Sequence, residues 1–389
     1  MQNPLRIALL TGDSPSDINA WSGTLYYMHK SLKSAGCKII TIGPAKPVFT
    51  HLYLSILNQL SINFFGKRID YRHSKIYAKA YGRIFTKRLS GCEFDIVLAV
   101  GGSEFAAYLD TTKPIVLVVD RTIAGAIEYH NILKNLWPWS QNQSIETDKL
   151  AMTRSDLNIY ASDWARDAAR TLYNIAEKKA ITIPFGANLD KIPPSTKIYE
   201  RLKQTEVLKL LFIGRDWETK GGAKAIDCYN AIVASGISVE LHVVGCEIPE
   251  EIRKLSIIGH GFLNKNISSE LKILTELYLQ SHFFILPTKF EAYGLVFVES
   301  AAFGLPSIGP NTGGVPTAMA NGQSGILMNE NCSGVDYAQE LLKLWTNKKL
   351  YEEQVIKTRN AFETGFTWEV WTKHFLLKIS QLQRPNSER

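Results

Sequence analysis

The chain has 389 residues, of which 45% are hydrophobic and 21% are charged. This length exceeds what one hydrophobic core requires, so the composition predicts two compact domains. Because no run of 18 or more apolar residues is free of charge or strong polarity, we do not expect an integral membrane protein. The five cysteines lie far apart without a C-x-x-C pair, which predicts neither a zinc site nor a disulfide framework and favours a reducing cytoplasm.

Short apolar runs alternate along the chain with stretches of helical period, the pattern of stacked βαβ units with a parallel sheet. The first run ends at a glycine turn and lacks the long apolar core of a signal peptide, so we expect a buried strand there. The strands expected in the first half are 5–11, 38–42, 94–100, 114–120, 156–160 and 180–183. Those expected in the second half are 208–213, 238–244, 282–286 and 305–308.

A polar segment with two prolines, residues 190–197, separates the two halves. Prolines and few apolar side chains are typical of an exposed linker between domains. We therefore expect an N-terminal domain over residues 1–190 and a C-terminal domain over residues 205–367. Residues 368–382 carry apolar side chains at helical spacing, so this stretch should form a helix that docks on one domain.

The segment 287–301 places two glutamates around the start of a predicted helix. A strand ends at Pro287 and the helix begins near residues 293–295, so free N–H groups and the positive end of the helix dipole should bind a diphosphate. Glu291 precedes the helix and Glu299 lies two turns inside it, about 12 Å away at about 1.5 Å per residue. Carboxylates at this separation can bind opposite ends of a sugar nucleotide. The alternative is a capping Glu291 and a solvated Glu299.

The segment 211–223 is another strand, loop and helix start, with two cations in its loop. Arg215 and Lys220 would neutralise charge that develops on a nucleotide diphosphate leaving group. Gly221 and Gly222 would let the backbone approach a ligand. The segment lacks the G-x-x-x-x-G-K-[ST] pattern of a P-loop, and the alternative is a basic surface loop.

In this order, the motifs resemble the C-terminal half of the family 4 retaining glycosyltransferases of the GT-B fold. The matching residues are Gly214-Arg215, Lys220-Gly221, Pro287, Glu291-Ala292-Tyr293-Gly294, Glu299 and Gly313-Gly314-Val315-Pro316. The resemblance extends to the N-terminal strand with its glycine loop and to residues 162–164, so it covers nearly the whole chain. It implies two Rossmann-like doubly wound α/β domains facing each other across a cleft, with a C-terminal helix 368–385 packing back towards the N-terminal domain.

The resemblance also implies roles for the matching residues. Arg215 and Lys220 would bind the donor phosphates, and Glu299 would bond the nucleotide ribose. Glu291 and the backbone of the next three residues would hold the transferred sugar, and Leu295 would present its N–H to a phosphate. The donor-binding residues expected in this half are Gly214, Arg215, Lys220, Glu291, Ala292, Tyr293, Gly294, Leu295 and Glu299.

Two positions of the N-terminal domain, which is expected to bind the acceptor, complete the candidate site. Gly23 lies in residues 21–24, a stretch predicted to form a flexible loop that could reach the donor, although a lone glycine often only serves a turn. Asp120 ends a predicted strand where related enzymes often carry a histidine that contacts sugar or acceptor. In this sequence Asp120 stands in place of that histidine. We therefore expect Asp120 to be a candidate catalytic residue beside Arg215, Lys220 and Glu291.

The resemblance implies a hexosyltransferase that retains the anomeric configuration through front-face attack, with a leaving-group phosphate oxygen assisting deprotonation of the acceptor. The acceptor would be a glycan, a glycolipid or a small-molecule hydroxyl. Arginine, lysine and helix dipoles usually neutralise the diphosphate in this family. The sequence contains no Asp-x-Asp motif of the kind that binds metal in the other major transferase fold, so we expect no cofactor and no obligatory metal.

Residues 48–65 are unusually apolar and aromatic, and a basic run follows them. Between Lys67 and Arg88 there are eight Lys or Arg and a single acid, Asp70. On one helix, six cations would form a continuous stripe opposite Ile76, Ala80, Ile84 and Leu89: Arg68, Arg72, Lys75, Lys79, Arg83 and Lys87. The region 48–88 could therefore rest on anionic lipid at the inner face of a membrane. The alternative is a solvated helix face over an ordinary core, and nucleic-acid binding is disfavoured because no recognised module accompanies the charge.

Two other functions remain compatible with such a fold. A nucleotide-sugar epimerase would bind the same donor, and a non-catalytic subunit would keep the fold without turnover. The Arg, Lys and Glu arrangement favours the transferase, and release of free nucleotide on addition of acceptor would distinguish it from the epimerase. A nicotinamide dehydrogenase is disfavoured because the first strand is followed by Thr11-Gly12-Asp13-Ser14 and not by G-x-G-x-x-G.

Overall fold

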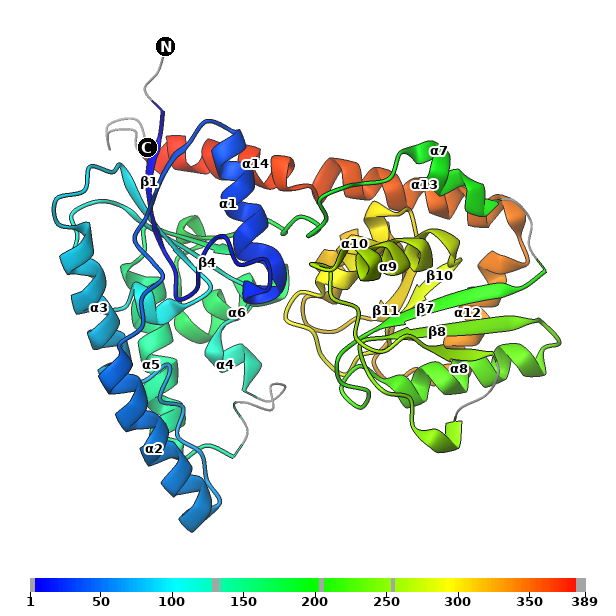
Figure 1. The fold of residues 1–389 in the computed structure, drawn as a ribbon, viewed down its shortest axis with the longest axis horizontal. Helices are drawn as coiled ribbons and strands as arrows, with labels where there is room; N and C mark the ends of the chain where they lie inside the picture. The colour runs from blue at the N-terminus through cyan, green and yellow to red at the C-terminus, as the bar shows by residue number, and fades with distance from the viewer. Residues whose placement is uncertain (1–3, 128–132, 134, 203–205, 253–255, 383–389) are drawn as a thin grey trace. The chain divides into compact units, whose positions relative to one another are not determined.

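The computed structural model describes residues 4–127, 133, 135–202, 206–252 and 256–382 (Figure 1). Contacts between residues divide the chain into two compact units. Unit 1 consists of Met1–Phe185 and Trp368–Arg389, and unit 2 consists of Gly186–Thr367. Each unit is an α/β domain built on a six-stranded sheet. Residues 383–385 of the expected terminal helix lie outside the described residues.

Unit 1 contains a parallel sheet with the strand order β2-β1-β3-β4-β5-β6. Its strands are β1 Arg6–Leu10, β2 Lys38–Thr41, β3 Ile96–Val100, β4 Ile115–Val119, β5 Leu157–Tyr160 and β6 Ala180–Thr182. Its α-helices are α1 Thr24–Ser34, α2 Val48–Phe65, α3 Lys75–Leu89, α4 Ile123–Ala126, α5 Pro138–Arg154, α6 Asp163–Tyr173 and α14 Trp368–Leu382. Short 3-10 helices are η1 Ala20–Gly23, η2 Ser103–Phe105 and η4 Glu177–Lys179.

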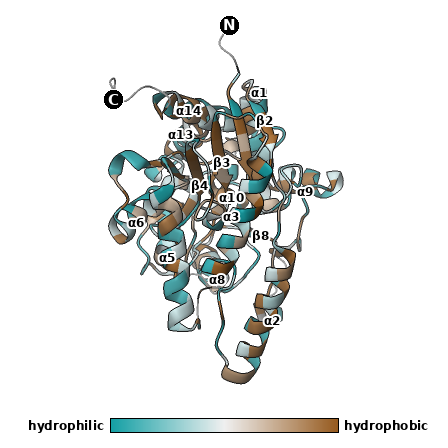
Figure 2. Ribbon diagram, turned by 90° about the vertical axis from the view of Figure 1, so that its left-hand side faces the viewer, coloured by the Kyte–Doolittle hydropathy of each residue, from teal (hydrophilic) through white to brown (hydrophobic). Residues whose placement is uncertain are grey.

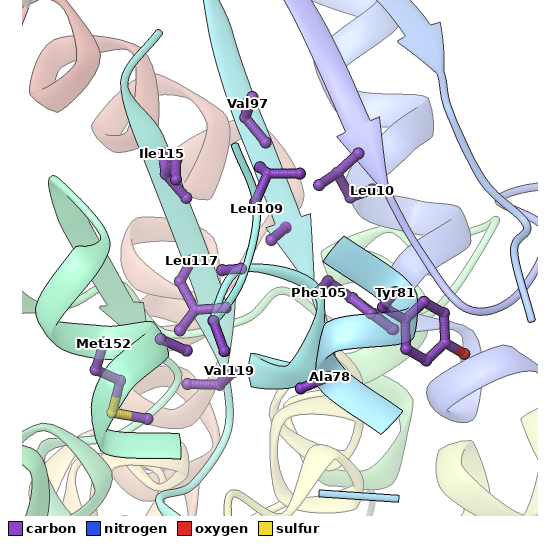
Figure 3. Packing of buried hydrophobic residues seen from close by; sticks show 14 of the residues in the cluster. Leu10, Ala78, Tyr81, Val97, Phe105, Leu109, Ile115, Leu117, Val119 and Met152 are labelled. Atoms are coloured by element: carbon purple, nitrogen blue, oxygen red, sulfur yellow. The ribbon is translucent and has the colours of Figure 1, made fainter. Parts of the chain in front are cut away.

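One face of this sheet packs against α3 and α5 (Figure 3). Alternate residues of the strands, such as Val97 and Leu117, point into this layer because successive side chains of a strand point to opposite faces. Tyr81 of α3 and Met152 of α5 meet them. Strands buried on both faces read as nearly continuous apolar runs, which explains why the sequence marks them so plainly.

Unit 2 contains a second parallel sheet, with the strand order β12-β11-β10-β7-β8-β9. Its strands are β7 Leu208–Ile213, β8 Val239–Val244, β9 Ile257–Gly259, β10 Phe283–Ile285, β11 Ser307–Pro310 and β12 Gly325–Met328. Its α-helices are α7 Ser195–Ile198, α8 Gly222–Ala234, α9 Ser268–Gln280, α10 Leu295–Ala302, α11 Val315–Ala318, α12 Gly334–Trp345 and α13 Lys348–Gly365. Its 3-10 helices are η5 Tyr199–Leu202, η6 Glu250–Ile252 and η7 Ala320–Gly322.

The order of strands reverses once in each sheet, as in doubly wound folds. In unit 1 the reversal lies between β1 and β3, and in unit 2 it lies between β7 and β10. Loops that leave the carboxyl ends of the two strands at a reversal diverge to opposite faces of the sheet and open a crevice, where ligands of such folds bind. In unit 2, these loops are the two motif segments that the sequence singled out.

The sequence predicted ten of these strands, and it missed β9 and β12. Both are short, and they form the two edges of the second sheet. The segment 190–197 is largely exposed, as expected, but the residues that follow it are not a plain linker. Ile198 and Arg201 are buried in unit 2.

The basic stripe is shorter than expected because the helix begins later. α3 starts at Lys75, so Arg68 and Arg72 precede it and cannot continue its face. The Ser74 hydroxyl caps the helix by accepting a hydrogen bond from the N–H of Tyr77. Ile76 was expected on the buried face, but it is exposed. The stripe on α3 therefore consists of Lys75, Lys79, Arg83 and Lys87, all exposed and four residues apart.

Within the described ranges, no helix is both long enough and apolar enough to cross a membrane.

Candidate functional site

The loops that follow β7 and β10 are joined at the strand reversal of unit 2. The carbonyl oxygen of Thr219, in the first loop, accepts two hydrogen bonds from the second loop. The donors are the N–H of Lys289 at 2.8 Å and the hydroxyl of Thr288 at 3.1 Å. The two motif segments, about 70 residues apart along the chain, thus form one surface at the carboxyl edge of the sheet.

Glycines in the loop after β7 allow tight packing of protein against protein. Gly221 has a φ of +77°, and a Cβ atom there would lie 2.0 Å from the carbonyl oxygen of Pro287. A Cβ atom at Gly222 would lie 2.2 Å from the Trp217 ring. The absence of a side chain at these glycines therefore serves packing against Pro287 and Trp217, and the expected approach of their backbone to a ligand stays a prediction. At Gly214, a Cβ atom would lie 2.6 Å from the Lys220 side chain, so this glycine lets the lysine fold across the loop.

Lys220 and Glu291 form an ion pair between the two loops. The Nζ atom of Lys220 donates to Oε1 of Glu291, and both side chains are largely shielded from water. Glu291 does not cap the helix, because the N-cap of α10 is Gly294 and no side chain accepts a capping hydrogen bond there. The alternative role of Glu291 as a capping residue is therefore wrong.

A third loop holds the backbone of Glu291 and Ala292 in place. The N–H of Gly314 donates to the carbonyl oxygen of Glu291 at 2.9 Å. Cβ atoms at Gly313 and Gly314 would lie 2.2 and 2.1 Å from the carbonyl oxygens of Glu291 and Ala292, respectively. This glycine pair therefore supports the loop that presents Glu291 and starts α10.

Glu299 lies on the buried side of α10, slightly more than one turn after its start at Leu295. The expected depth of two turns was too large because the helix begins at the late end of the expected range. The Glu299 side chain is only 3% exposed, so the alternative of a solvated glutamate is wrong. Its Oε1 atom accepts from Nζ of Lys265, and its Oε2 atom accepts from the Tyr278 hydroxyl at 3.2 Å. Burial and the Glu299 carboxylate both raise the pKa of Tyr278, which therefore stays a hydrogen-bond donor.

Lys265 and Tyr278 are residues of this site that sequence reasoning missed. Lys265 lies in a polar loop and Tyr278 in an amphipathic helix, and neither position carries a motif. Tyr278 stacks on Phe303, just after α10, with ring centroids 4.7 Å apart. The guanidinium of Arg201 donates to the carbonyl oxygens of both Tyr278 and Phe303. The residues after the linker therefore fix α9 against α10.

Arg215 is exposed at the start of the loop after β7. Its guanidinium lies 5.1 Å from the centroid of the Phe262 ring, an arrangement typical of a cation–π contact. Gly245 ends β8 with a φ of +95°, and a Cβ atom there would lie 2.7 Å from the carbonyl oxygen of Gly214. Gly245 thus permits close packing of the loop that begins at Gly214.

In unit 1, the stretch around Gly23 is a short helical turn, η1, and its contacts anchor it. The indole N–H of Trp21 donates to Oδ2 of Asp120 at 3.2 Å, and its ring packs edge-on against Phe185. The stretch is thus a short helical turn with Trp21 held by two contacts, and its expected flexibility and reach to the donor stay predictions. The structure brings Gly23 and Asp120 near each other. Gly23 follows Trp21 by two residues, and Asp120 accepts the hydrogen bond from the Trp21 indole.

Glu104 is another residue that the sequence analysis missed. It lies in η2, directly after β3, at the strand reversal of unit 1. Its Oε2 atom is buried and has no hydrogen-bond partner in the structure as described. Burial raises the pKa of Glu104, while the facing His73 partly offsets this effect. Among the described residues, no group of three or more His, Cys, Asp or Glu could hold a metal ion.

Part of the chain is similar to a known protein family. Residues 196–361, most of unit 2, match the family model for glycosyl transferases group 1. This match covers less than half of the chain and shows that unit 2 is similar to this family.

A curated relative is D-inositol 3-phosphate glycosyltransferase of Geodermatophilus obscurus, which is 25% identical over 221 residues. That match covers 52% of this chain and 48% of the relative. The chain therefore spans about half the length of the curated relatives it matches.

Two solved structures share the fold over nearly their whole length. Sucrose-phosphate synthase from Thermosynechococcus elongatus gives a TM-score of 0.68 at 14% identity, over 98% of this chain and 99% of that one. HepE of Anabaena, solved in complex with UDP and glucose, gives a TM-score of 0.60 at 14% identity, over 97% of this chain and 100% of that one. At such identity these likenesses establish the fold of this chain alone, which is the two-domain α/β GT-B fold.

Proposed function

We propose that this protein is a retaining glycosyltransferase of the family 4 type, which transfers a hexose from a nucleotide diphosphate sugar to a hydroxyl acceptor. One observation carries the proposal. Two Lys–Glu pairs, Lys220–Glu291 and Lys265–Glu299, lie on either side of the N-terminal turn of α10, at the strand reversal of unit 2. This arrangement offers cations, carboxylates and free helical N–H groups together, which is what a sugar nucleotide requires.

The phosphates of the donor would bind at the start of α10. The N–H of Leu295 is in the first turn of that helix, where amide groups have no partner within the helix and the dipole favours an anion. Nζ of Lys220 already donates to Glu291 and has further N–H donors for a phosphate oxygen. Arg215 is exposed on the same loop and can bind a phosphate with two parallel hydrogen bonds.

The two carboxylates would bind hydroxyl groups on either side of the diphosphate. Glu299 would accept hydrogen bonds from the ribose, and its lysine and tyrosine partners hold it in one orientation. Glu291, together with the backbone of Ala292, Tyr293 and Gly294, would hold the transferred sugar. Because Lys220 neutralises Glu291 in the absence of donor, this carboxylate is held in place before the donor binds.

In the transfer step, the acceptor oxygen would attack the anomeric carbon on the face from which the leaving group departs. The bond from that carbon to the phosphate oxygen breaks, and the nucleoside diphosphate leaves with the bonding electrons. A phosphate oxygen then takes the proton of the acceptor hydroxyl. Arg215, Lys220 and the α10 dipole would stabilise the charge that grows on the leaving group.

Unit 1 would supply the acceptor side of the reaction. We propose Asp120 as a residue that contacts the acceptor or the sugar, and Gly23 as a backbone contact of the donor. Their location at the carboxyl edge of the first sheet supports this proposal, because ligands of doubly wound folds bind at that edge. The acceptor is a hydroxyl of a glycan, a glycolipid or a small molecule.

The test is incubation with UDP, GDP and ADP sugars, followed by proton magnetic resonance of the anomeric signals with water as the slow acceptor. We expect release of one free nucleoside diphosphate and a first-formed sugar with the anomeric configuration of the donor. A new sugar nucleotide without release would instead identify an epimerase. Binding without any turnover, with glycan or glycolipid acceptors also present, would identify a non-catalytic subunit.

The same assay tests the proposal that no metal and no cofactor is required. We expect the rate to be unchanged after dialysis against EDTA, because lysine, arginine and the helix dipole neutralise the diphosphate. A loss of activity that Mg²⁺ or Mn²⁺ restores would contradict this.

A further inference from the structure

Helix α2 of unit 1 has its apolar side chains on the outside. Its 18 residues contain no Asp, Glu, Lys or Arg, yet only Leu54 and Ser61 are buried. The exposed face consists of large hydrophobic side chains: Val48, Phe49, Leu52, Tyr53, Ile56, Leu60 and Phe64, followed by Phe65 at the end of the helix. Phe49 is 90% exposed. Figure 2 shows this helix with apolar residues along much of its length.

The opposite face of α2 is held to the domain by Leu54, which is part of the hydrophobic core, and by polar contacts. Nδ1 of His51 lies 3.1 Å from the Tyr77 hydroxyl, and Oδ1 of Asn58 accepts from the N–H of Ile69 at 2.7 Å. The Ser61 hydroxyl donates to the carbonyl oxygen of Lys67 and accepts from the indole N–H of Trp137. An amphipathic helix of a water-soluble domain normally turns its apolar face to the core. Here Leu54 and the polar contacts anchor one side of the helix and leave the large apolar side chains of the other side exposed.

Basic residues surround this apolar face in the sequence and in the fold. From Lys46 to Ser90 the chain holds nine Lys or Arg and a single acid, Asp70. Asp70 does not oppose them, because it is buried and paired with His73 at 2.8 Å. Burial raises the pKa of Asp70, but the His73 charge and hydrogen bonds outweigh this and hold it below its usual value, so Asp70 and His73 neutralise each other.

The helix that packs beside α2 carries a groove lined by cations. On α3, Lys79, Arg83 and Lys87 line this groove together with Tyr108 and Asp110. The ammonium of Lys79 lies 5.6 Å from the centroid of the Tyr108 ring. Three cations and one acid around an open groove favour an anionic group of modest size, such as the phosphate of a lipid headgroup.

We propose that α2 is a monotopic membrane-docking helix, which inserts its exposed face into the interface of an anionic lipid bilayer while the cations of α3 bind the headgroups. An apolar face of this kind inserts about 5–10 Å, to the boundary of headgroups and acyl chains. Charge complementarity selects the lipid surface over a second copy of this chain, whose own α2 region would be equally basic. Docking at the cytoplasmic face would bring unit 1 to an acceptor carried in the membrane. That consequence rests on the proposed glycosyl transfer, but the docking does not.

The test is flotation of the full chain with vesicles of phosphatidylcholine alone and of phosphatidylcholine with 30 mol% phosphatidylglycerol. Since each cation near an anionic surface adds to binding, we expect partitioning into the anionic vesicles to be at least about tenfold stronger and to weaken with salt. Phe49→Ser combined with Leu52→Ser should reduce partitioning at least about tenfold, since apolar burial drives insertion. Lys79→Gln combined with Arg83→Gln should remove most of the preference for anionic vesicles.

Matched control variants separate docking from general surface effects. Leu52 and Leu172 are exposed by 58% and 53%, respectively, and Leu377 by 52%. Leu172→Ser combined with Leu377→Ser, on α6 and α14 of the same unit, should therefore leave partitioning unchanged. Lys272→Gln combined with Lys349→Gln, exposed lysines of unit 2, should leave the lipid preference unchanged.

Several results would overturn the proposal. One is equal partitioning of the parent and the Phe49→Ser, Leu52→Ser variant, and another is indifference to lipid charge. A third is a parent protein that does not bind vesicles and is a dimer in light scattering, while the Phe49→Ser, Leu52→Ser variant is a monomer. In that case α2 would be a contact between two copies of the chain. Because vesicle binding is measured without substrate, its failure is distinct from a failure of the transferase proposal.

Discussion

Glu299 shows how a buried charge is held at this site. The carboxylate is only 3% exposed, and each of its oxygens accepts a hydrogen bond, from Lys265 and from Tyr278. A buried carboxylate without such partners is strongly unfavourable. Lys265, which is 33% exposed, therefore supplies a cationic partner for the buried Glu299 where a ribose is proposed to bind.

A double-mutant cycle on this pair measures that dependence. We expect Lys265→Met to lower the free energy of unfolding by about 1–3 kcal/mol, because it leaves a buried carboxylate without its cation. Glu299→Gln in the same background should recover most of this loss, since no charge then remains. The exposed pair Lys272 and Glu276, 4.0 Å apart on α9, is the control, and its coupling should be at most about 0.5 kcal/mol. Additive effects of Lys265→Met and Glu299→Gln in urea denaturation would contradict this account.

Because Glu104 is buried, we expect it to make the stability of the folded chain depend on pH. Burial raises its pKa in the folded chain, so between the ordinary value of about 4.3 and the raised value the folded state binds more protons than the unfolded state. Stability then falls as pH rises through this window. Glu104→Gln removes this contribution, so its melting temperature relative to the parent should increase with pH, by an amount equivalent to about 1 kcal/mol.

Glu369→Gln, an exposed glutamate of α14 in the same unit, is the control for Glu104→Gln and should track the parent at every pH. A difference in melting temperature between Glu104→Gln and the parent that does not change between pH 4 and pH 8 would show that Glu104 carries no buried charge.

At the scale of elements, three loops of unit 2 form the candidate site. The loops after β7 and β10 share the Thr219 carbonyl, and the loop after β11 packs its glycines on the backbone of Glu291 and Ala292. The site therefore depends on close backbone approach as much as on side chains. Glycine is required where a Cβ atom would meet a carbonyl oxygen.

Gly314→Ala tests this dependence because the backbone of Gly314 is not in the left-handed region, so only the clash matters. A Cβ atom would lie 2.1 Å from the Ala292 carbonyl oxygen, which must move together with the start of α10. We expect nucleotide binding at least about tenfold weaker, since misplacing binding groups by about 1 Å is costly. Gly365→Ala, where nothing lies within 4 Å of the added atom, should bind like the parent. If both variants bind equally well, the glycine loop does not support the site.

The sequence predicted most strands, and both motif loops, because buried parallel strands are continuous apolar runs and the motifs follow them directly. β9 and β12 were missed because runs of three and four residues carry too little periodicity. Lys265 and Tyr278 could not be predicted, since their contact with Glu299 joins residues 34 and 21 positions apart on different elements. The buried side of α3 differed from the expected one because the aromatic row Tyr77, Tyr81 and Phe85 faces the core in place of Ile76, Ala80 and Ile84.

At the scale of the whole molecule, the C-terminal helix belongs to the first unit. α14 follows unit 2 in the chain, but Trp371 and Phe375 are fully buried and stack with centroids 5.2 Å apart. The Ser31 hydroxyl of α1 bonds the carbonyl oxygen of Trp368 and lies 2.7 Å from the Thr372 hydroxyl. The chain thus passes twice between the units, and α14 completes the core of unit 1.

Trp371→Ala should therefore destabilise unit 1 alone. Removing a buried tryptophan typically costs about 3–5 kcal/mol. We expect limited proteolysis to degrade unit 1 first and to leave a resistant fragment close to residues 186–367 that still binds nucleotide. Leu377→Ala, on the exposed side of the same helix, should match the parent. Simultaneous loss of both units in the Trp371→Ala protein would show that they do not fold independently.

Calorimetric titration of the full chain with UDP, GDP and ADP and their sugar conjugates tests whether a nucleotide sugar binds at the strand reversal of unit 2. We expect one nucleotide to bind, and we expect Lys220→Met and Glu299→Gln each to weaken its binding at least about tenfold, since both remove charged hydrogen-bond partners. Lys272→Met and Glu276→Gln should bind like the parent. Binding of no nucleotide, or binding that Lys220→Met and Glu299→Gln leave intact, would contradict a donor site at the strand reversal of unit 2.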